Sequence, residues 1–248
     1  MKRTNSTAIA TALFAVILPG VSTASLSTDP IVTVGLLGSY SALEFKERKG
    51  TSTEYMPEGG LFVNFGNKMT NPNGLIYQAE ISGQYAEKDS QKVKDGQADV
   101  DLGWRVAFDP INSIDVLFGA GYKWNRFNPA SSKYDIDLTS RTPFAKVTTG
   151  FNHQFNTAVL RIEAGVRQVI NGDSQLNVHG ISNQTLDLQD TTNPFIELSL
   201  LFNRQGSLPA VVSLYYNHFN YDFDGQFVLA HLNRQTRDEY GAKIGLVF

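Results

Sequence analysis

Apolar and polar residues alternate along most of the chain after residue 30, which is the period of a β-strand whose successive side chains point to opposite faces. The clearest stretch is residues 98–108, where one face carries Ala98, Val100, Leu102, Trp104, Val106 and Phe108. A helix would not sort these residues onto one side. The same test predicts an all-β chain of ten strands, at residues 31–45, 60–66, 75–86, 98–108, 114–125, 142–152, 158–167, 194–203, 209–221 and 234–248.

The connections between these segments alternate in length. Three are short, at residues 109–113, 152–157 and 204–208, and 67–73 is a looser fourth. The longer and more polar ones are 46–58, 87–96, 126–141, 171–193 and 222–233. Short turns that alternate with long loops are typical of a closed antiparallel transmembrane β-barrel. We therefore predict a ten-stranded barrel with both ends on the side of the short turns. Eight strands would leave two alternating segments unused, and twelve would need strands within the loop at 171–193.

The last residues of the chain carry a more specific pattern. Tyr240, Ile244, Leu246 and the terminal Phe248 share one face of the last predicted strand, and small or charged residues share the other. This resembles the C-terminal signature of outer-membrane β-barrel proteins, which implies that these four residues are the signal read by the outer-membrane assembly machinery. Small barrels of the OmpA/OmpX, opacity-protein and porin-like kinds are the families that the whole chain resembles.

The beginning of the chain predicts its compartment. Lys2 and Arg3 precede an apolar run at residues 8–18, and small residues at 22–24 follow it, which together are typical of a secretory signal peptide. The run is too short for a permanent membrane helix. We expect a signal peptide at residues 1–24 and a single barrel domain at 25–248, located in the outer membrane of a Gram-negative bacterium.

Composition narrows the chemistry. The chain has no cysteine, which excludes disulfides, thiol catalysis and cysteine-based metal sites. Lys2 and Arg3 belong to the predicted signal peptide, so 19 basic residues face 24 acidic residues in the mature chain, a net charge of −5. That sign disfavours nucleic acid as a partner. No metal-ligand cluster or phosphate-binding glycine loop is present, and we expect no cofactor.

Alternation also predicts which residues face the barrel interior. Pairing across the short turns places Asp99 opposite Lys123 and Lys146 opposite Glu163, with the in/out alternation preserved. The charged residues of the predicted interior are Glu80, Asp99, Asp101, Asp115, Glu163, Glu197 and Glu239, with Arg105, Lys123, Lys146, Arg161, Arg167 and Lys243. Acids and bases nearly balance. This favours a neutralised structural network over a selective pore, whose lining would favour one sign.

Basic residues recur in the loops that we place at the cell surface. They are Lys46, Arg48, Lys49, Lys88, Lys92, Lys94, Arg126, Lys133, Arg141, Arg234 and Arg237. Clustered cations bind phosphate through charge-assisted hydrogen bonds. We therefore expect contacts with lipopolysaccharide at the outer rim, in addition to the surrounding membrane lipids.

These features favour a non-enzymatic protein whose barrel is a scaffold and whose loops contact lipopolysaccharide or an external partner. A narrow porin-like channel for small solutes is the alternative, because ten strands enclose more space than eight. The omptin proteases are a remote alternative. They share the strand count, and Asp99 and Asp101 resemble their carboxylate pair, but no Asp-x-His sequence occurs. Lipid A deacylases need a Ser/His couple facing lipid, and none is evident.

Overall fold

The computed structural model describes residues 30–47, 50–129, 136–204, 206–227 and 232–248, so the predicted signal peptide lies outside the described residues. The described chain is all-β. Its strands are β1 (Ile31–Glu47), β2 (Gly50–Gly66), β3 (Gly74–Lys88), β4 (Gln91–Ala107), β5 (Asn112–Asn128), β6 (Ile136–Gln154), β7 (Val159–Val169), β8 (Asp173–Val178), β9 (Ser182–Asp187), β10 (Thr192–Phe202), β11 (Ala210–Phe227) and β12 (Leu232–Val247). Within this part of the chain, no helix is long and apolar enough to cross a membrane.

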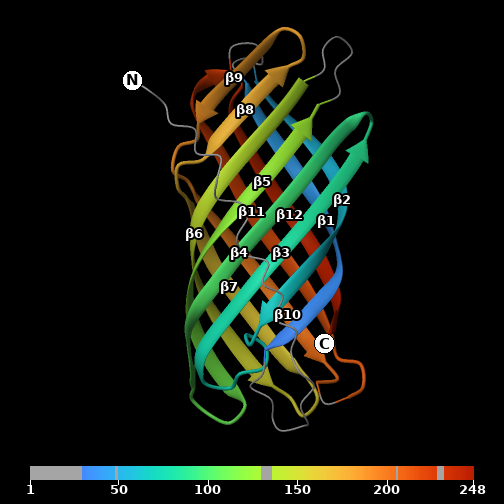
Figure 1. Cartoon of the computed structure of the whole chain (residues 1–248), viewed down its shortest axis with the longest axis vertical. Helices are drawn as coiled ribbons and strands as arrows, with labels where there is room; N and C mark the ends of the chain where they lie inside the picture. The colour runs from blue at the N-terminus through green and yellow to red at the C-terminus, as the bar shows by residue number, and fades with distance from the viewer. Residues whose placement is uncertain (1–29, 48–49, 130–135, 205, 228–231) are drawn as a thin grey trace.

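Ten strands close into an antiparallel barrel, as predicted (Figure 1). Neighbours in the chain pair in order from β1 to β7, then β7 pairs with β10, and the series continues to β12. The first and last strands close the cylinder, with Val34 opposite Leu246. Closure removes the open edges of the sheet and pairs its backbone groups within the sheet, as a lipid environment requires.

The remaining two strands form a hairpin that lengthens one side of the wall. Strand β8 pairs with the first part of β6, at Ile136–Arg141, while β7 pairs with the later part, at Phe144–Gln154. The hairpin β8–β9 therefore lies beyond the ends of the short strands β7 and β10, at the long-loop end of the barrel (Figure 1). It comes from the region 171–193 that was predicted as a loop.

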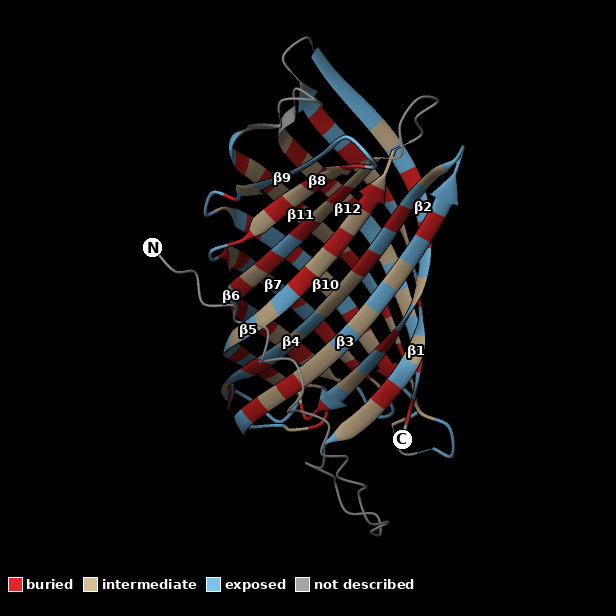
Figure 2. Cartoon of the chain, turned by 45° about the horizontal axis from the view of Figure 1, so that its top comes forward, coloured by how far each residue is buried: buried red, intermediate tan, exposed pale blue. Residues whose placement is uncertain are grey.

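Exposed apolar side chains form the outward face of the barrel. Trp104 and Phe118 are more than half exposed, and exposed and buried residues alternate along the strands (Figure 2). Exposed aliphatic residues in every strand of the cylinder would be costly in water, and together they match the apolar band of a transmembrane barrel. The parity predicted for the outward faces of β10 and β11 also holds, with Ile196 and Leu214 exposed.

The short turns and both ends of the barrel sheet lie at one end. The backbone N–H of Phe248 donates to Val32 O, and Val32 N–H donates to Phe248 O, so the terminal residue is held by the first strand. In the turn between β4 and β5, Asp109 accepts hydrogen bonds from the side chain and backbone of Asn112 and from the backbone of Ile111. These bonds, that of the Asn112 side chain above all, lower the pKa of the Asp109 carboxyl.

Several predicted loops are wrong in extent, because the strands continue into them. Most of 46–58 belongs to β1 and β2, and most of 87–96 to β3 and β4. Toward the long loops the inward residues become apolar and the outward ones polar, as in the run Leu43, Glu44, Phe45 and Lys46. The sense of the alternation is therefore reversed there, although the backbone ladder continues.

Candidate functional site

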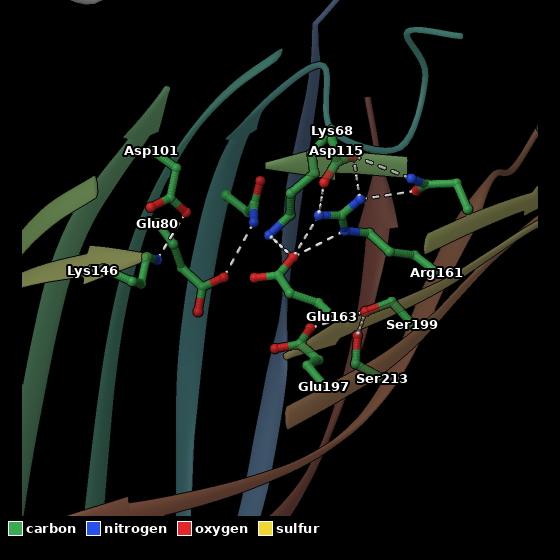
Figure 3. A network of polar contacts seen from close by, with 12 residues as sticks. Lys68, Glu80, Asp101, Asp115, Lys146, Arg161, Glu163, Glu197, Ser199 and Ser213 are labelled. Carbon is green, nitrogen blue, oxygen red and sulfur yellow. Dashed lines mark hydrogen bonds and ion pairs between the residues drawn. The ribbon is translucent and has the colours of Figure 1, made fainter. Parts of the chain in front are cut away.

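The barrel interior holds a charged network in three groups. The group nearest the short turns is centred on Asp115, which accepts hydrogen bonds from Arg105 and from both terminal nitrogens of Arg161. Arg161 also pairs with Glu163 at 2.9 Å, and Lys68 reaches the same carboxylate at 2.8 Å (Figure 3). Arg161 and Asp115 are almost fully buried, and these contacts join β4, β5 and β7 across the lumen.

The turn between β2 and β3 lies across this end of the lumen. Its residues 67–73 include Lys68 and Asn71, whose carbonyl oxygens accept hydrogen bonds from Arg105, and Thr70, whose carbonyl accepts one from Arg204. Met69 packs against an inward-facing apolar cluster of Val159, Leu201, Val211 and Val247. We call residues 67–73 the plug turn. This turn was predicted as a short connection, and Lys68 was not among the predicted interior residues.

The middle group consists of two ion-pair sets. Lys146 lies 2.5 Å from Asp99 and 2.8 Å from Asp101, and Lys243 lies 2.7 Å from Glu80 and 3.3 Å from Glu197. Arg167 has a different environment, because its guanidinium lies 4.1 Å from the ring centre of Phe195 and donates to Asn217. Each of these cations lies within the barrel and is held by side chains from nearby strands.

The third group lies toward the long loops and is centred on Arg237. This guanidinium donates to both carboxylate oxygens of Glu58 at 2.9 Å, to Asp95 at 2.5 Å and to the hydroxyl of Ser41, and it pairs with Glu239 at 3.0 Å. Lys123 lies 2.6 Å from the other oxygen of Asp95. Arg237 and Glu58 have no exposed side-chain surface, whereas Asp95, Lys123 and Glu239 border a small cavity.

Three predicted assignments are corrected by these contacts. Lys123 pairs with Asp95 and not with Asp99, because Asp99 lies opposite Gly121 in the β4–β5 ladder. Lys146 lies opposite Arg167 and pairs with Asp99 and Asp101 instead of Glu163. Both registers differ from the prediction by an even number of residues, which keeps each side chain on its predicted face.

The third correction concerns Arg237, which was predicted as a lipopolysaccharide contact at the rim. It faces the interior, on the same side of β12 as Gln235 and Glu239. The residues Glu58 and Asp95, which the prediction left in loops, are its partners. The strand alternation that placed Glu239 inward would have placed Arg237 inward as well.

An apolar layer lies within the barrel beyond Arg237. Inward-facing residues of most of the barrel strands and the added hairpin meet there, and they are Leu43, Phe45, Met56, Ala86, Val93, Phe127, Leu138, Leu176, Val178, Leu188, Phe219, Tyr221 and Phe223. Phe45 and Phe127 stack with ring centres 4.9 Å apart. The hairpin β8–β9 thus contributes to the interior as well as to the wall.

The other predicted rim cations lie at the long-loop end and mostly pair with acids. These pairs are Lys92 with Glu87, Arg126 with Asp137, Arg141 with Asp173 and Arg234 with Asp222, and Lys88 donates to the carbonyl of Tyr55. Lys46 and Lys94 make no ion pair with the described residues. Arg48, Lys49 and Lys133 lie outside the described residues.

The features weighed for catalysis are dispersed. Asp99 and Asp101 lie deep in the barrel against Lys146 instead of at an open rim. His218 contacts Asp238, with Nδ1 2.8 Å from Oδ1, on the outward face of β11 and β12. Within the described ranges, no three His, Asp or Glu side chains are grouped so that they could hold a metal ion.

The assembly residues predicted from the C-terminal pattern lie on the outward face of β12. Tyr240, Ile244, Leu246 and Phe248 are all exposed, Phe248 to 75%. They point away from the charged interior and toward the region that the apolar band occupies. Whether the assembly machinery reads them stays a prediction.

Comparison with known proteins supports the architecture. No family model and no curated protein matches the chain. Among solved structures, the outer membrane protease OmpT from Escherichia coli matches with a TM-score of 0.58 at 8% identity, over 91% of this chain and 98% of that one. The translocator domain of the autotransporter NalP from Neisseria meningitidis gives a TM-score of 0.45 at 11% identity, over 90% and 89% of the two chains. The likeness to OmpT shows a shared barrel fold.

Proposed function

We propose that this protein is an integral outer-membrane barrel with a closed lumen, a non-enzymatic scaffold whose outer rim contacts lipopolysaccharide. The membrane assignment is supported by the closed cylinder and its apolar outward face. The observation that carries the scaffold function is the filling of the lumen. The plug turn, the ion-pair network and the apolar layer occupy it at successive levels.

The filling argues against the narrow channel. Ten strands enclose more space than side chains fill in an eight-stranded barrel, but here long Arg and Lys side chains and the plug turn take up that space. Two cavities beside Lys243 have volumes of about 40 Å³ each, and a third beside the plug turn and Arg105 has about 110 Å³. A buried water needs roughly 10–15 Å³, so the first two have room for a few waters each and the third for several more. The apolar layer then separates them from the long-loop end.

Conductance of the purified full-length mature protein in a planar bilayer tests this function. We expect no discrete current steps in molar potassium chloride. Heat-modifiable migration of the same sample in gel electrophoresis confirms that the inserted protein is folded. Reproducible steps that scale with salt concentration would refute the closed lumen and favour the narrow channel.

The outward face at the rim supports the lipopolysaccharide contact. Lys46 lies directly opposite Arg234, and Lys94 directly opposite Arg126. Like charges in directly opposed positions destabilise an antiparallel pair, and an anion bound between them would relieve the repulsion. Arg234 and Arg126 are partly neutralised by their acids, whereas Lys46 and Lys94 have no such partner among the described residues.

Thermal unfolding with and without purified lipopolysaccharide tests the contact. We expect lipopolysaccharide to raise the unfolding temperature of the wild type, and the double variant K46A/K94A to lose most of that rise. K92A is the matched control, because Lys92 already pairs with Glu87. An unchanged unfolding temperature of the wild type would contradict the proposed contact.

A further inference from the structure

An aspartate–histidine pair lies on the outward face of the barrel. It belongs neither to the interior network nor to the rim cations. His218 and Asp238 are directly opposed in the β11–β12 ladder. Asp238 Oδ1 lies 2.8 Å from His218 Nδ1 and accepts a hydrogen bond of 2.7 Å from the hydroxyl of Tyr216. Asp238 Oδ2 and His218 Nε2 take no part in these bonds. Both side chains are about one third exposed.

The pair lies directly above a cluster of tyrosines. The next outward row of the ladder toward the short turns is Tyr216 opposite Tyr240, with ring centres 4.9 Å apart. Tyr40 lies opposite Tyr240 on the other side and stacks on Tyr55 at 5.9 Å. Tyrosine is favoured at the level where acyl chains meet headgroups, which places His218 and Asp238 at the headgroup level.

The outward rows above the pair carry charges of both signs. Thr236 lies opposite Glu44 and Asn220 in the next row, and Arg234 follows it opposite Lys46 and Asp222. Toward the long loops the outward face therefore passes from tyrosine rings to the Asp238 and His218 atoms, then to hydroxyl, amide and carboxylate groups, and finally to two cations, of which Arg234 pairs with Asp222. A glycolipid headgroup has the complementary series of acyl chains, sugar rings with hydroxyls, and phosphate.

We propose that Asp238 and His218 bind the sugar hydroxyls of a phosphorylated glycolipid headgroup, which rests on the lipopolysaccharide contact proposed above. Asp238 Oδ2 accepts from one hydroxyl, and His218 Nε2 donates to or accepts from its neighbour. Tyr216 holds the carboxylate in place, and the tyrosine rings beneath pack against the apolar face of the sugar. Lys46 and Arg234 bind the phosphate. The site therefore distinguishes a glycolipid from an anionic phospholipid, which offers phosphate without the sugar.

The test uses the full-length mature protein in detergent and two probes, purified lipopolysaccharide and phosphatidylglycerol. For each probe, the rise in unfolding temperature is measured as a function of concentration. In D238N and H218Q we expect the lipopolysaccharide concentration at half-saturation to increase about five-fold, since a net hydrogen bond contributes on the order of 1 kcal/mol. The response to phosphatidylglycerol should be unchanged. Y216F retains the ring and should give a smaller increase.

The matched control is H153Q. His153 is an outward-facing histidine at the opposite end of the barrel, where its Nδ1 lies 2.7 Å from Asn112 Oδ1, and its replacement should leave both responses at the wild-type values. Equal half-saturation for wild type, D238N and H218Q, with a clear wild-type response, would overturn the sugar site and leave the rim contact standing. Equal weakening toward both probes would also overturn it, by showing that the substitutions do not act on recognition of the sugar. No wild-type response to lipopolysaccharide would instead remove the proposed function.

Discussion

Replacing Arg237 by methionine removes the central cation of a fully buried group while preserving most of the side-chain length. Glu58 and Glu239 then lose the guanidinium that pairs with them, and Asp95 retains Lys123 as its cation and the hydrogen bond from Asn125. Removing one partner of a buried ion pair costs about 3–5 kcal/mol. Because more than one carboxylate loses its partner here, we expect the free energy of unfolding to fall by an amount at the upper end of that range.

Arg234 supplies the matched control for Arg237. It lies on the same strand three residues earlier, on the outward face, and its ion pair with Asp222 is partly exposed. An exposed pair contributes about 0–1 kcal/mol, so R234M should have a correspondingly small effect. The double variant R237M/E58Q removes one of the uncompensated carboxylates and should recover part of the loss.

Equilibrium unfolding by urea, with the protein folded into lipid vesicles, measures these differences. The two tryptophans, Trp104 and Trp124, both face outward and report the transfer of the wall from lipid to water through their fluorescence. If R237M and R234M lower the free energy of unfolding by similar amounts below about 1 kcal/mol, water reaches the Arg237 group. That result would refute the closed lumen and with it the scaffold assignment.

Two further predictions concern assembly and orientation. Deleting Phe248 removes its two backbone hydrogen bonds to Val32 and the exposed aromatic end of β12. We therefore expect heat-modifiable folded protein to appear more slowly in outer-membrane fractions, with secretion across the inner membrane unchanged. An unchanged rate of appearance would contradict the assembly signal. A cysteine at Asn183 in β9 should react with a membrane-impermeant reagent on intact cells, whereas one at Ser207 in the β10–β11 turn should not, and the reverse pattern would show that the barrel is inverted.

The sequence predicted the faces of the strands better than it predicted their partners. Asp99, Lys123 and Lys146 all face the interior as expected, but their ion pairs differ. Alternation has a period of two, so every shift by two residues leaves the apolar pattern equally satisfied. The register between β4 and β5 depends on how far each strand continues into the turn. The five residues between the two predicted segments did not determine that.

The plug turn and the apolar layer were beyond prediction for a different reason. A seven-residue turn has no repeating pattern, and the position of Lys68 against Glu163 depends on how the turn folds back into the barrel. The apolar residues near the long loops were predicted as loop or strand ends, because their outward neighbours are polar there. The region 171–193 was recognised as the place where a twelve-stranded barrel would need its extra strands, but only the fold shows that Leu176 and Val178 in β8 face inward into the apolar layer.

The composition of the interior connects these missed elements to the closed lumen. A ten-stranded wall leaves a space that short side chains cannot fill, and an unfilled apolar space of this size would be destabilising. Long cations such as Arg161 and Arg237 span the space, but burying them requires carboxylates from opposing walls. The near balance of acids and bases that the sequence displayed is therefore a packing requirement of the wide barrel. An open pore would instead have kept water in that space and needed neither the plug turn nor the buried pairs.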